Sequence, residues 1–128
     1  MTNSIIFLST CAATGLGAVC RYLLDGKIKK HSSFAIPLGT IGVNMFACFL
    51  VGISTFILAN SALSSPLAKS LISTGFLGGF STFSTAMHEG VTLIRQGKTR
   101  HAIIHSAAML AGSLITCSLG YNLGALII

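Results

Sequence analysis

The side chains best suited to chemistry in this chain lie inside its apolar segments, where polar groups are costly. Asn44 follows Thr40 by four residues, a spacing that places both on one face of a helix. An Asn side chain offers two N–H donors, which suit a small anion or a backbone carbonyl. The pair therefore predicts either a position on an ion path or a hydrogen bond between helices.

A second group is the stretch GFLGGFSTFST from Gly75 to Thr85, within an uncharged run from Ser70 to Met87. Its glycines and hydroxyl residues weaken a helix. Irregular backbone at membrane depth is tolerated only where it is buried or lines a polar path, and such interruptions point to ion sites. Phe83 lies among these hydroxyls, and the positive edge of its ring can face a small anion. Ordinary packing is the alternative for any Phe.

Three further features are polar. Arg21 lies near the end of an apolar segment, as either an interfacial anchor or a functional residue. Glu89 is expected to pair with a base such as Arg21 or Arg95, or to lie at a vestibule. Near the C-terminus a stripe recurs every four residues, with hydroxyls nearby, and it predicts a lined path or contacts with a neighbouring helix. The stripe comprises His105, Met109, Ser113 and Cys117, and the nearby hydroxyls are Ser106, Ser113 and Thr116.

Composition places these residues in a membrane. The 128 residues are 52% hydrophobic and 8% charged, whereas soluble domains carry about 25% charged residues. Mean hydropathy is +0.85. The two carboxylates, Asp25 and Glu89, are far apart, and no metalloprotease, hydrolase or P-loop motif is present, so no enzyme is predicted.

Four apolar segments are each long enough to cross about 30 Å of hydrocarbon, which takes roughly 20 residues. We expect one four-helix transmembrane domain over 1–128, with the third helix broken in its middle and Pro66 in its first turn. The expected spans are residues 4–24, 36–59, 67–94 and 102–128.

Loop charges predict the orientation. The loops 25–34 and 95–101 share one side and carry three Lys together with Arg95, Lys98 and Arg100, against Lys69 alone on the other side. By the positive-inside rule, these two loops are cytoplasmic and both termini lie outside the cell membrane. Basic residues confined to short loops give no reason to expect nucleic acid.

Three motifs in order resemble the Fluc/CrcB family of fluoride channels over the whole chain. They are GAVCRY at Gly17–Tyr22, IPLGTIGVN at Ile36–Asn44 and TGFLGGFSTFST at Thr74–Thr85, followed by Glu89. The resemblance implies passive export of fluoride, which reduces its toxicity, through a dimer of antiparallel subunits with two pores.

The resemblance also implies site residues. A structural, untransported Na⁺ would be held by backbone carbonyls of Gly78 and Ser81. The family's pore Asn and first pore Phe match Asn44 and Phe83, and its motif Arg and Thr match Arg21 and Thr40. Its hydroxyl track on the fourth span matches Ser113 and Thr116. Substituting Gly78 by Val is expected to impair folding by crowding the break.

Two features depart from the family's pattern. A second Phe commonly follows the first by three residues, and here that position is Ala86. The strong charge bias also favours one orientation, whereas an antiparallel homodimer needs two. We therefore expect an oppositely oriented paralogue as partner, with a homodimer as the alternative. Competing functions are a four-span drug/proton antiporter, which the absence of a carboxylate in the first span disfavours, and a structural partner subunit without its own pore.

Overall fold

The computed structural model describes residues 2–31, 33, 35–62 and 64–128, and within these ranges every regular element is a helix. This confirms the all-helical prediction for the part of the chain described. The elements in order are α1 (Thr2–His31), α2 (Leu38–Asn60), α3 (Pro66–Lys69), the π-helical segment η1 (Ser70–Leu77), α4 (Gly78–Phe80), α5 (Ser84–Arg95) and α6 (Thr99–Ile127).

Within the described ranges, three helices are long and apolar enough to cross a membrane. They are Asn3–His31 within α1, the helix α2 and the helix α6. The third expected span is divided among α3, η1, α4 and α5, and residues 81–83 belong to none of them. Ser81 has extended backbone angles, φ −77° and ψ 162°. The third segment therefore does not count as a continuous spanning helix.

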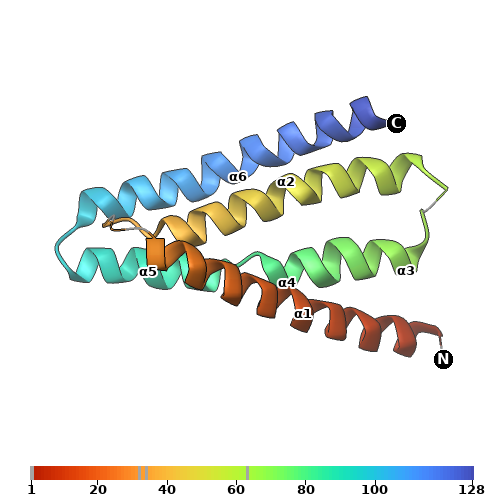
Figure 1. Cartoon of the computed structure of the whole chain (residues 1–128), viewed down its shortest axis with the longest axis horizontal. Coiled ribbons are helices and arrows are strands. Elements are labelled where there is room, and N and C mark those ends of the chain that lie inside the picture. Colours follow the sequence, from red (N-terminus) through yellow and green to blue (C-terminus); the bar gives the residue numbers. More distant parts are fainter. Residues whose placement is uncertain (1, 32, 34, 63) are drawn as a thin grey trace.

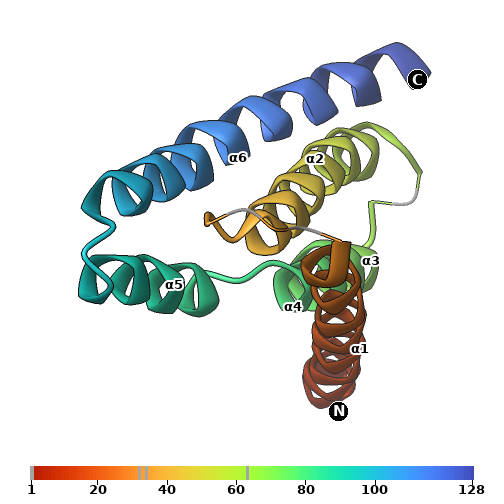
Figure 2. The same cartoon turned by 60° about the vertical axis from the view of Figure 1, so that its left-hand side comes forward.

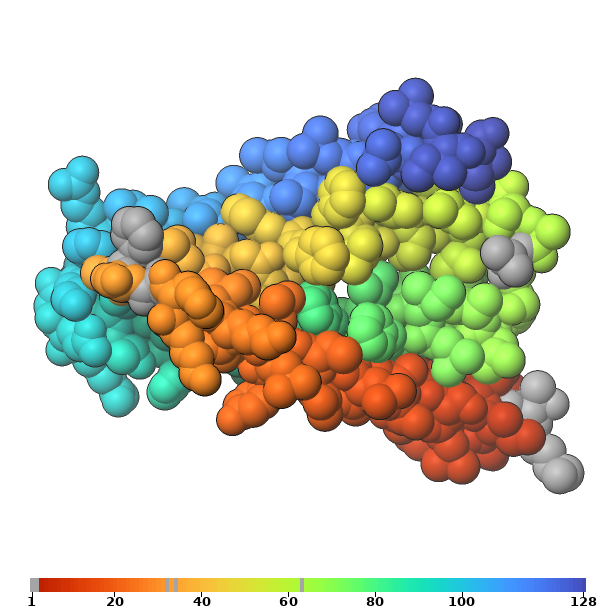
Figure 3. Space-filling model, viewed as in Figure 1, coloured from red at the N-terminus to blue at the C-terminus, as the bar shows by residue number. Residues whose placement is uncertain are grey.

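The helices lie side by side in layers (Figures 1 and 2). α2 lies between α6 and the first part of the third segment, α5 packs directly against α6, and α1 packs against η1 and α4. In the space-filling view, green residues of the third segment appear between α1 and α2 (Figure 3). Both termini lie at one end with the α2–α3 connection, and the other two connections share the opposite end (Figure 1). The two basic connections are therefore at the same end of the molecule.

These two connections are shorter than expected. α1 continues to His31, so most of the predicted loop 25–34 is helical, and its residues 32 and 34 lie outside the described part. An ion pair of 2.8 Å between Lys29 Nζ and Asp25 Oδ2, four residues apart, supports the extra helical turns. Of the predicted loop 95–101, Arg95 ends α5 and α6 begins at Thr99. Gly97 turns the chain with a positive φ of 75°, which glycine adopts readily.

The start of the third segment agrees with the sequence. Pro66 occupies the first turn of α3, and the Ser65 side chain accepts a hydrogen bond of 3.1 Å from the Ala68 backbone N–H. A proline in the first turn removes an N–H that has no helical partner, and the serine satisfies another.

Small residues allow close helix packing, as expected for helices in lipid. A Cβ atom added at Gly52 or Gly120 would overlap backbone atoms of the opposite helix in the α2–α6 pair. The same holds at Gly17 and Gly79, where α1 meets η1 and α4. Glycine at these four positions therefore sets the distance between the helices.

Candidate ion-path site

Asn44 holds the non-helical residues of the third segment. Its amide nitrogen donates to the Thr82 carbonyl at 2.8 Å, and its amide oxygen accepts from the Thr82 N–H at 2.8 Å. The side chain is 4% exposed. The sequence predicted for Asn44 either a position on an ion path or a hydrogen bond between helices. The structure shows hydrogen bonds from Asn44 on α2 to Thr82 of the third segment. The amide nitrogen also approaches the Met109 sulfur at 3.7 Å, a weak bond.

This bond frees a carbonyl in the third segment. In a continuous helix the Thr82 N–H would bond the carbonyl four residues earlier, that of Gly78. Because Asn44 takes that N–H, the donor to the Gly78 carbonyl among the described residues is instead the Ser81 hydroxyl, at 3.3 Å. A similar change occurs one turn later, where the Thr85 N–H donates to the Thr82 hydroxyl at 3.3 Å.

The two carbonyls matched to the family's sodium site are accordingly outside regular helical bonding. The Ser81 carbonyl accepts a long hydrogen bond of 3.5 Å from Arg21 Nη1. Ser81 is half-buried and Gly78 is exposed on the single chain. Carbonyl oxygens with a free lone pair are hard ligands that suit a small cation, so the donor set fits sodium.

A cavity of about 290 Å³ adjoins the non-helical residues and collects several predicted ion-path residues. Asn44, Phe83 and Ser113 line it, from three different segments. The Phe83 side chain is 77% exposed on the single chain, so much of its ring is free to face a partner or an ion. The remaining residues that line the 290 Å³ cavity are Cys48, Ser81, Thr82, Ala86, Met87, Ser106, Met109 and Leu110.

Two predicted ion-path residues lie apart from this cavity. The Thr116 hydroxyl donates back to its own helix, to the Gly112 carbonyl at 2.8 Å. The Thr40 hydroxyl donates to Glu89 Oε1 at 2.8 Å, one turn along α2 from Asn44. Thr40 thus belongs to a second polar group nearer the end of the bundle that carries the basic connections.

That second group contains the acidic residues. Lys29 Nζ lies 2.8 Å from Asp25 Oδ2 and 3.4 Å from Glu89 Oε1, so one lysine joins α1 to α5. Glu89 thus pairs with a base, and among the described residues that base is Lys29 and not Arg21 or Arg95. The sequence analysis placed Lys29 in a loop and so could not predict this contact. Only because α1 continues past Asp25 does the Lys29 ammonium group lie close to Glu89.

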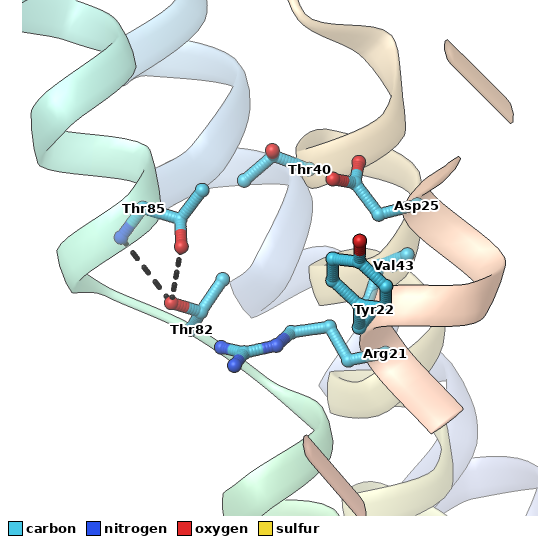
Figure 4. Close-up of a pocket in the computed structure, with 7 residues that line it drawn as sticks. All are labelled: Arg21, Tyr22, Asp25, Thr40, Val43, Thr82 and Thr85. Carbon is cyan, nitrogen blue, oxygen red and sulfur yellow. Dashed lines mark hydrogen bonds between the residues drawn. The ribbon is translucent and has the colours of Figure 1, made fainter. Parts of the chain in front are cut away.

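Arg21 lies instead beside a smaller polar cavity of about 200 Å³ (Figure 4). Its guanidinium points toward the non-helical residues, with Thr82 and Thr85 on the opposite wall. Tyr22 and Asp25 of α1 and Thr40 and Val43 of α2 complete the lining. Through its long contact with the Ser81 carbonyl, Arg21 connects α1 to the non-helical residues.

Comparisons with known proteins agree on one family. Residues 8–121 match the family described as "CrcB-like protein, Camphor Resistance (CrcB)". The chain is 36% identical over 122 residues to fluoride-specific ion channel FluC 1 of Leifsonia xyli subsp. xyli, covering 95% of this chain and 88% of the relative. It is 40% identical over 111 residues to fluoride-specific ion channel FluC 3 of Bifidobacterium longum, covering 87% and 91%. It is 41% identical over 98 residues to fluoride-specific ion channel FluC of Chlorobaculum tepidum, covering 77% of each.

Proposed function

This chain belongs to the CrcB-like protein family, and from that premise we propose that it is a fluoride-specific ion channel of the cell membrane. It conducts fluoride passively out of the cytoplasm, driven by the inside-negative voltage, and so reduces fluoride toxicity. It carries out no covalent chemistry and is not an enzyme.

The observation that carries this proposal is the convergence of Asn44, Phe83 and Ser113 on one cavity beside the non-helical residues. A conducted anion must exchange water hydrogen bonds for protein donors that hold it weakly. One Asn44 N–H bonds only the Met109 sulfur at 3.7 Å, and an anion can replace that weak contact. The Ser113 hydroxyl and the positive edge of Phe83 add further weak sites.

Fluoride efflux from liposomes tests the proposal. Liposomes containing the purified protein and potassium fluoride are treated with a potassium ionophore, and external fluoride is followed with an electrode. We expect fast efflux at equal pH on both sides, and no comparable efflux when chloride replaces fluoride. Protein-free liposomes measure the leak.

The same assay separates the competing functions. An antiporter would need a proton gradient, and a structural subunit would give no efflux alone. Glu89 Oε1 lies 3.4 Å from the Lys29 ammonium group and accepts a hydrogen bond from Thr40. These contacts argue against an antiporter, because a resident lysine already occupies the place of a drug cation at this oxygen.

Replacing Phe83 by Ala is expected to reduce fluoride efflux by about tenfold, because the ring edge contributes one of few weak sites for the anion. The reference is Phe7→Ala, which removes a ring that is 67% exposed on α1. Equal fluoride efflux from the two variants would contradict a role for Phe83 in the ion path.

We also propose that the Gly78 and Ser81 carbonyls hold a structural sodium ion. Support comes from the diversion of the Thr82 N–H to Asn44, which leaves the Gly78 carbonyl without its helical donor. A bound cation would offset the negative ends of these exposed dipoles. Arg21 shares the Ser81 carbonyl and would help to fix its direction.

The partner we propose is a second subunit of this family in the opposite orientation, with a paralogue favoured over a homodimer. The six basic residues of the two expected cytoplasmic loops favour a single orientation for this chain, with its termini outside. Large exposed apolar side chains on α1 and α6 suit lipid or a partner. Robust efflux by the purified single species would contradict an obligate paralogue.

A further inference from the structure

An apolar groove of about 500 Å³ runs between α5 and α6, and the proposed ion path gives it no role. The buried Gly90 lies at its base, and the exposed side chains of Val91 and Ile103 form part of its sides. Among the residues that line it, only Thr99 and Ser106 have polar side chains. Because empty space loses dispersion contacts, such a groove is filled in a membrane by a lipid chain or by another protein.

The groove has the length of one layer of acyl chains. Along α6 its lining residues run from Thr99 to Leu110, which at about 1.5 Å per residue is about 16 Å. Half of the hydrocarbon core of a bilayer is about 15 Å thick. The groove therefore reaches from the end of the bundle that carries the basic connections to about the middle of the membrane, which is the depth of a single phospholipid chain.

The end of the groove at the α5–α6 connection is basic. Ile94 and Thr99 line the groove there, and the residues beside them in the chain are Arg95, Lys98 and Arg100, all of them exposed. No ion pair joins these three bases to another described residue. A phosphate group at this end of the groove would therefore meet three positive charges that are not already paired.

The protein itself cannot supply the opposite charge. Its two acidic side chains are Asp25 and Glu89, and Lys29 Nζ lies 2.8 Å from the first and 3.4 Å from the second. The basic α5–α6 connection thus needs an anion from outside the chain. In a membrane that anion is the headgroup of an anionic lipid, which basic residues at the cytoplasmic surface attract.

An oppositely oriented copy of this chain fits the basic end of the groove less well. Such a copy would bring its own termini and its α2–α3 connection to this end, since these lie together at the opposite end of the bundle (Figure 1). The charged side chain of that region is Lys69. A second copy would therefore add positive charge beside the basic connection, whereas an anionic phospholipid neutralises it.

We propose that the α5–α6 groove is a binding site for an anionic phospholipid, with one acyl chain along the groove and the phosphate held by Arg95, Lys98 and Arg100. The site goes beyond the proposed channel function and rests only on the membrane location of the chain. Met87 and Leu110 line both the groove and the 290 Å³ cavity, so the bound chain lies directly beside the ion-path cavity.

Fluorescence quenching tests the site, because the chain has no Trp and a single introduced Trp reports alone. Ile103→Trp places the reporter in the groove, and Leu114→Trp places it on the same helix outside the groove. The two native side chains are 65% and 64% exposed. Each variant is reconstituted in phosphatidylcholine vesicles that contain an equal fraction of either phosphatidylglycerol or phosphatidylcholine brominated on the acyl chain.

At Ile103→Trp we expect phosphatidylglycerol to bind about threefold to fivefold more tightly than phosphatidylcholine, the size expected from a few basic residues near one anionic headgroup. At Leu114→Trp we expect the two brominated lipids to quench equally. Comparing the two lipids at the same Trp cancels the depth of the reporter. Val91→Trp, on the α5 side of the groove, repeats the measurement if Ile103→Trp does not fold.

The headgroup contact is tested by adding Lys98→Gln and Arg100→Gln to the groove reporter, which should abolish the preference for phosphatidylglycerol. The matched control adds Lys27→Gln and Lys30→Gln, which remove the same charge from exposed positions at the C-terminal end of α1 and should leave the preference unchanged.

Three results would overturn the proposal. Equal quenching by both lipids in the groove would mean that no headgroup is selected there. A preference that survives Lys98→Gln with Arg100→Gln, or that both charge variants lose alike, would place the headgroup elsewhere. Quenching by neither lipid would mean that a second protein subunit covers the groove. None of these measurements depends on fluoride passage, so a failure of the proposed channel function would be seen separately, in the efflux assay.

Discussion

Replacing Asn44 by Asp is expected to reduce fluoride efflux by about a hundredfold or more. An aspartate still accepts the Thr82 N–H, but it cannot donate to the Thr82 carbonyl, which then faces a carboxylate at hydrogen-bond distance. The new negative charge also lies on the cavity that an anion must enter. A buried unpaired group and anion repulsion act together, and each alone costs about 1–3 kcal/mol or more.

The measurement is liposome efflux, compared with that of Asn3→Asp, in which the same change falls on an exposed residue near the start of α1. A negative charge in the first turn of a helix is favourable, so this control should fold and conduct normally. Comparable efflux from the two variants would show that Asn44 is not on the ion path. Chromatography in detergent separates a slow channel from a misfolded one.

The sequence predicted the helical architecture well because long apolar segments leave few alternatives. Four apolar segments of membrane-spanning length and Pro66 at a helix start both follow from local composition. Connections were predicted less well. Charged residues at 25–31 resemble a loop when they are read singly, and the Asp25–Lys29 pair that keeps them helical has meaning only once α1 is known to continue.

The candidate site likewise has residues that the sequence could identify and contacts that it could not. Asn44, Phe83 and Ser113 could be singled out because polar or ring side chains in apolar segments are conspicuous, and the structure places them on one cavity. The partners of Glu89 could not be predicted, because they depend on how α1, α2 and α5 are rotated against one another. A hydroxyl in an apolar helix need not face an ion path. The Thr116 hydroxyl donates instead to the Gly112 carbonyl of the same helix.

A final expectation concerns Gly79, which sets the contact between α1 and α4. Gly78→Val was expected to crowd the third segment, but a Cβ at Gly78 would meet only the Ser73 carbonyl oxygen, at an ordinary 3.8 Å. A Cβ at the next residue would overlap the Thr14 backbone, whose Cα would lie 2.9 Å away. For a single added methyl group, the crowding within the chain is therefore far greater at Gly79, where even alanine is too large.

Gly79→Ala is expected to destabilise the protein by at least about 1–3 kcal/mol, the usual cost of overpacking, because the atoms it meets are backbone and cannot rotate aside. Separating α1 from α4 would also displace Arg21 from the Ser81 carbonyl. Thermal unfolding in detergent measures the effect. Gly15→Ala is the matched control, since a Cβ there meets nothing within 4 Å. If Gly79→Ala unfolds at the same temperature as Gly15→Ala, the close approach of α1 and α4 is not what holds the third segment in place.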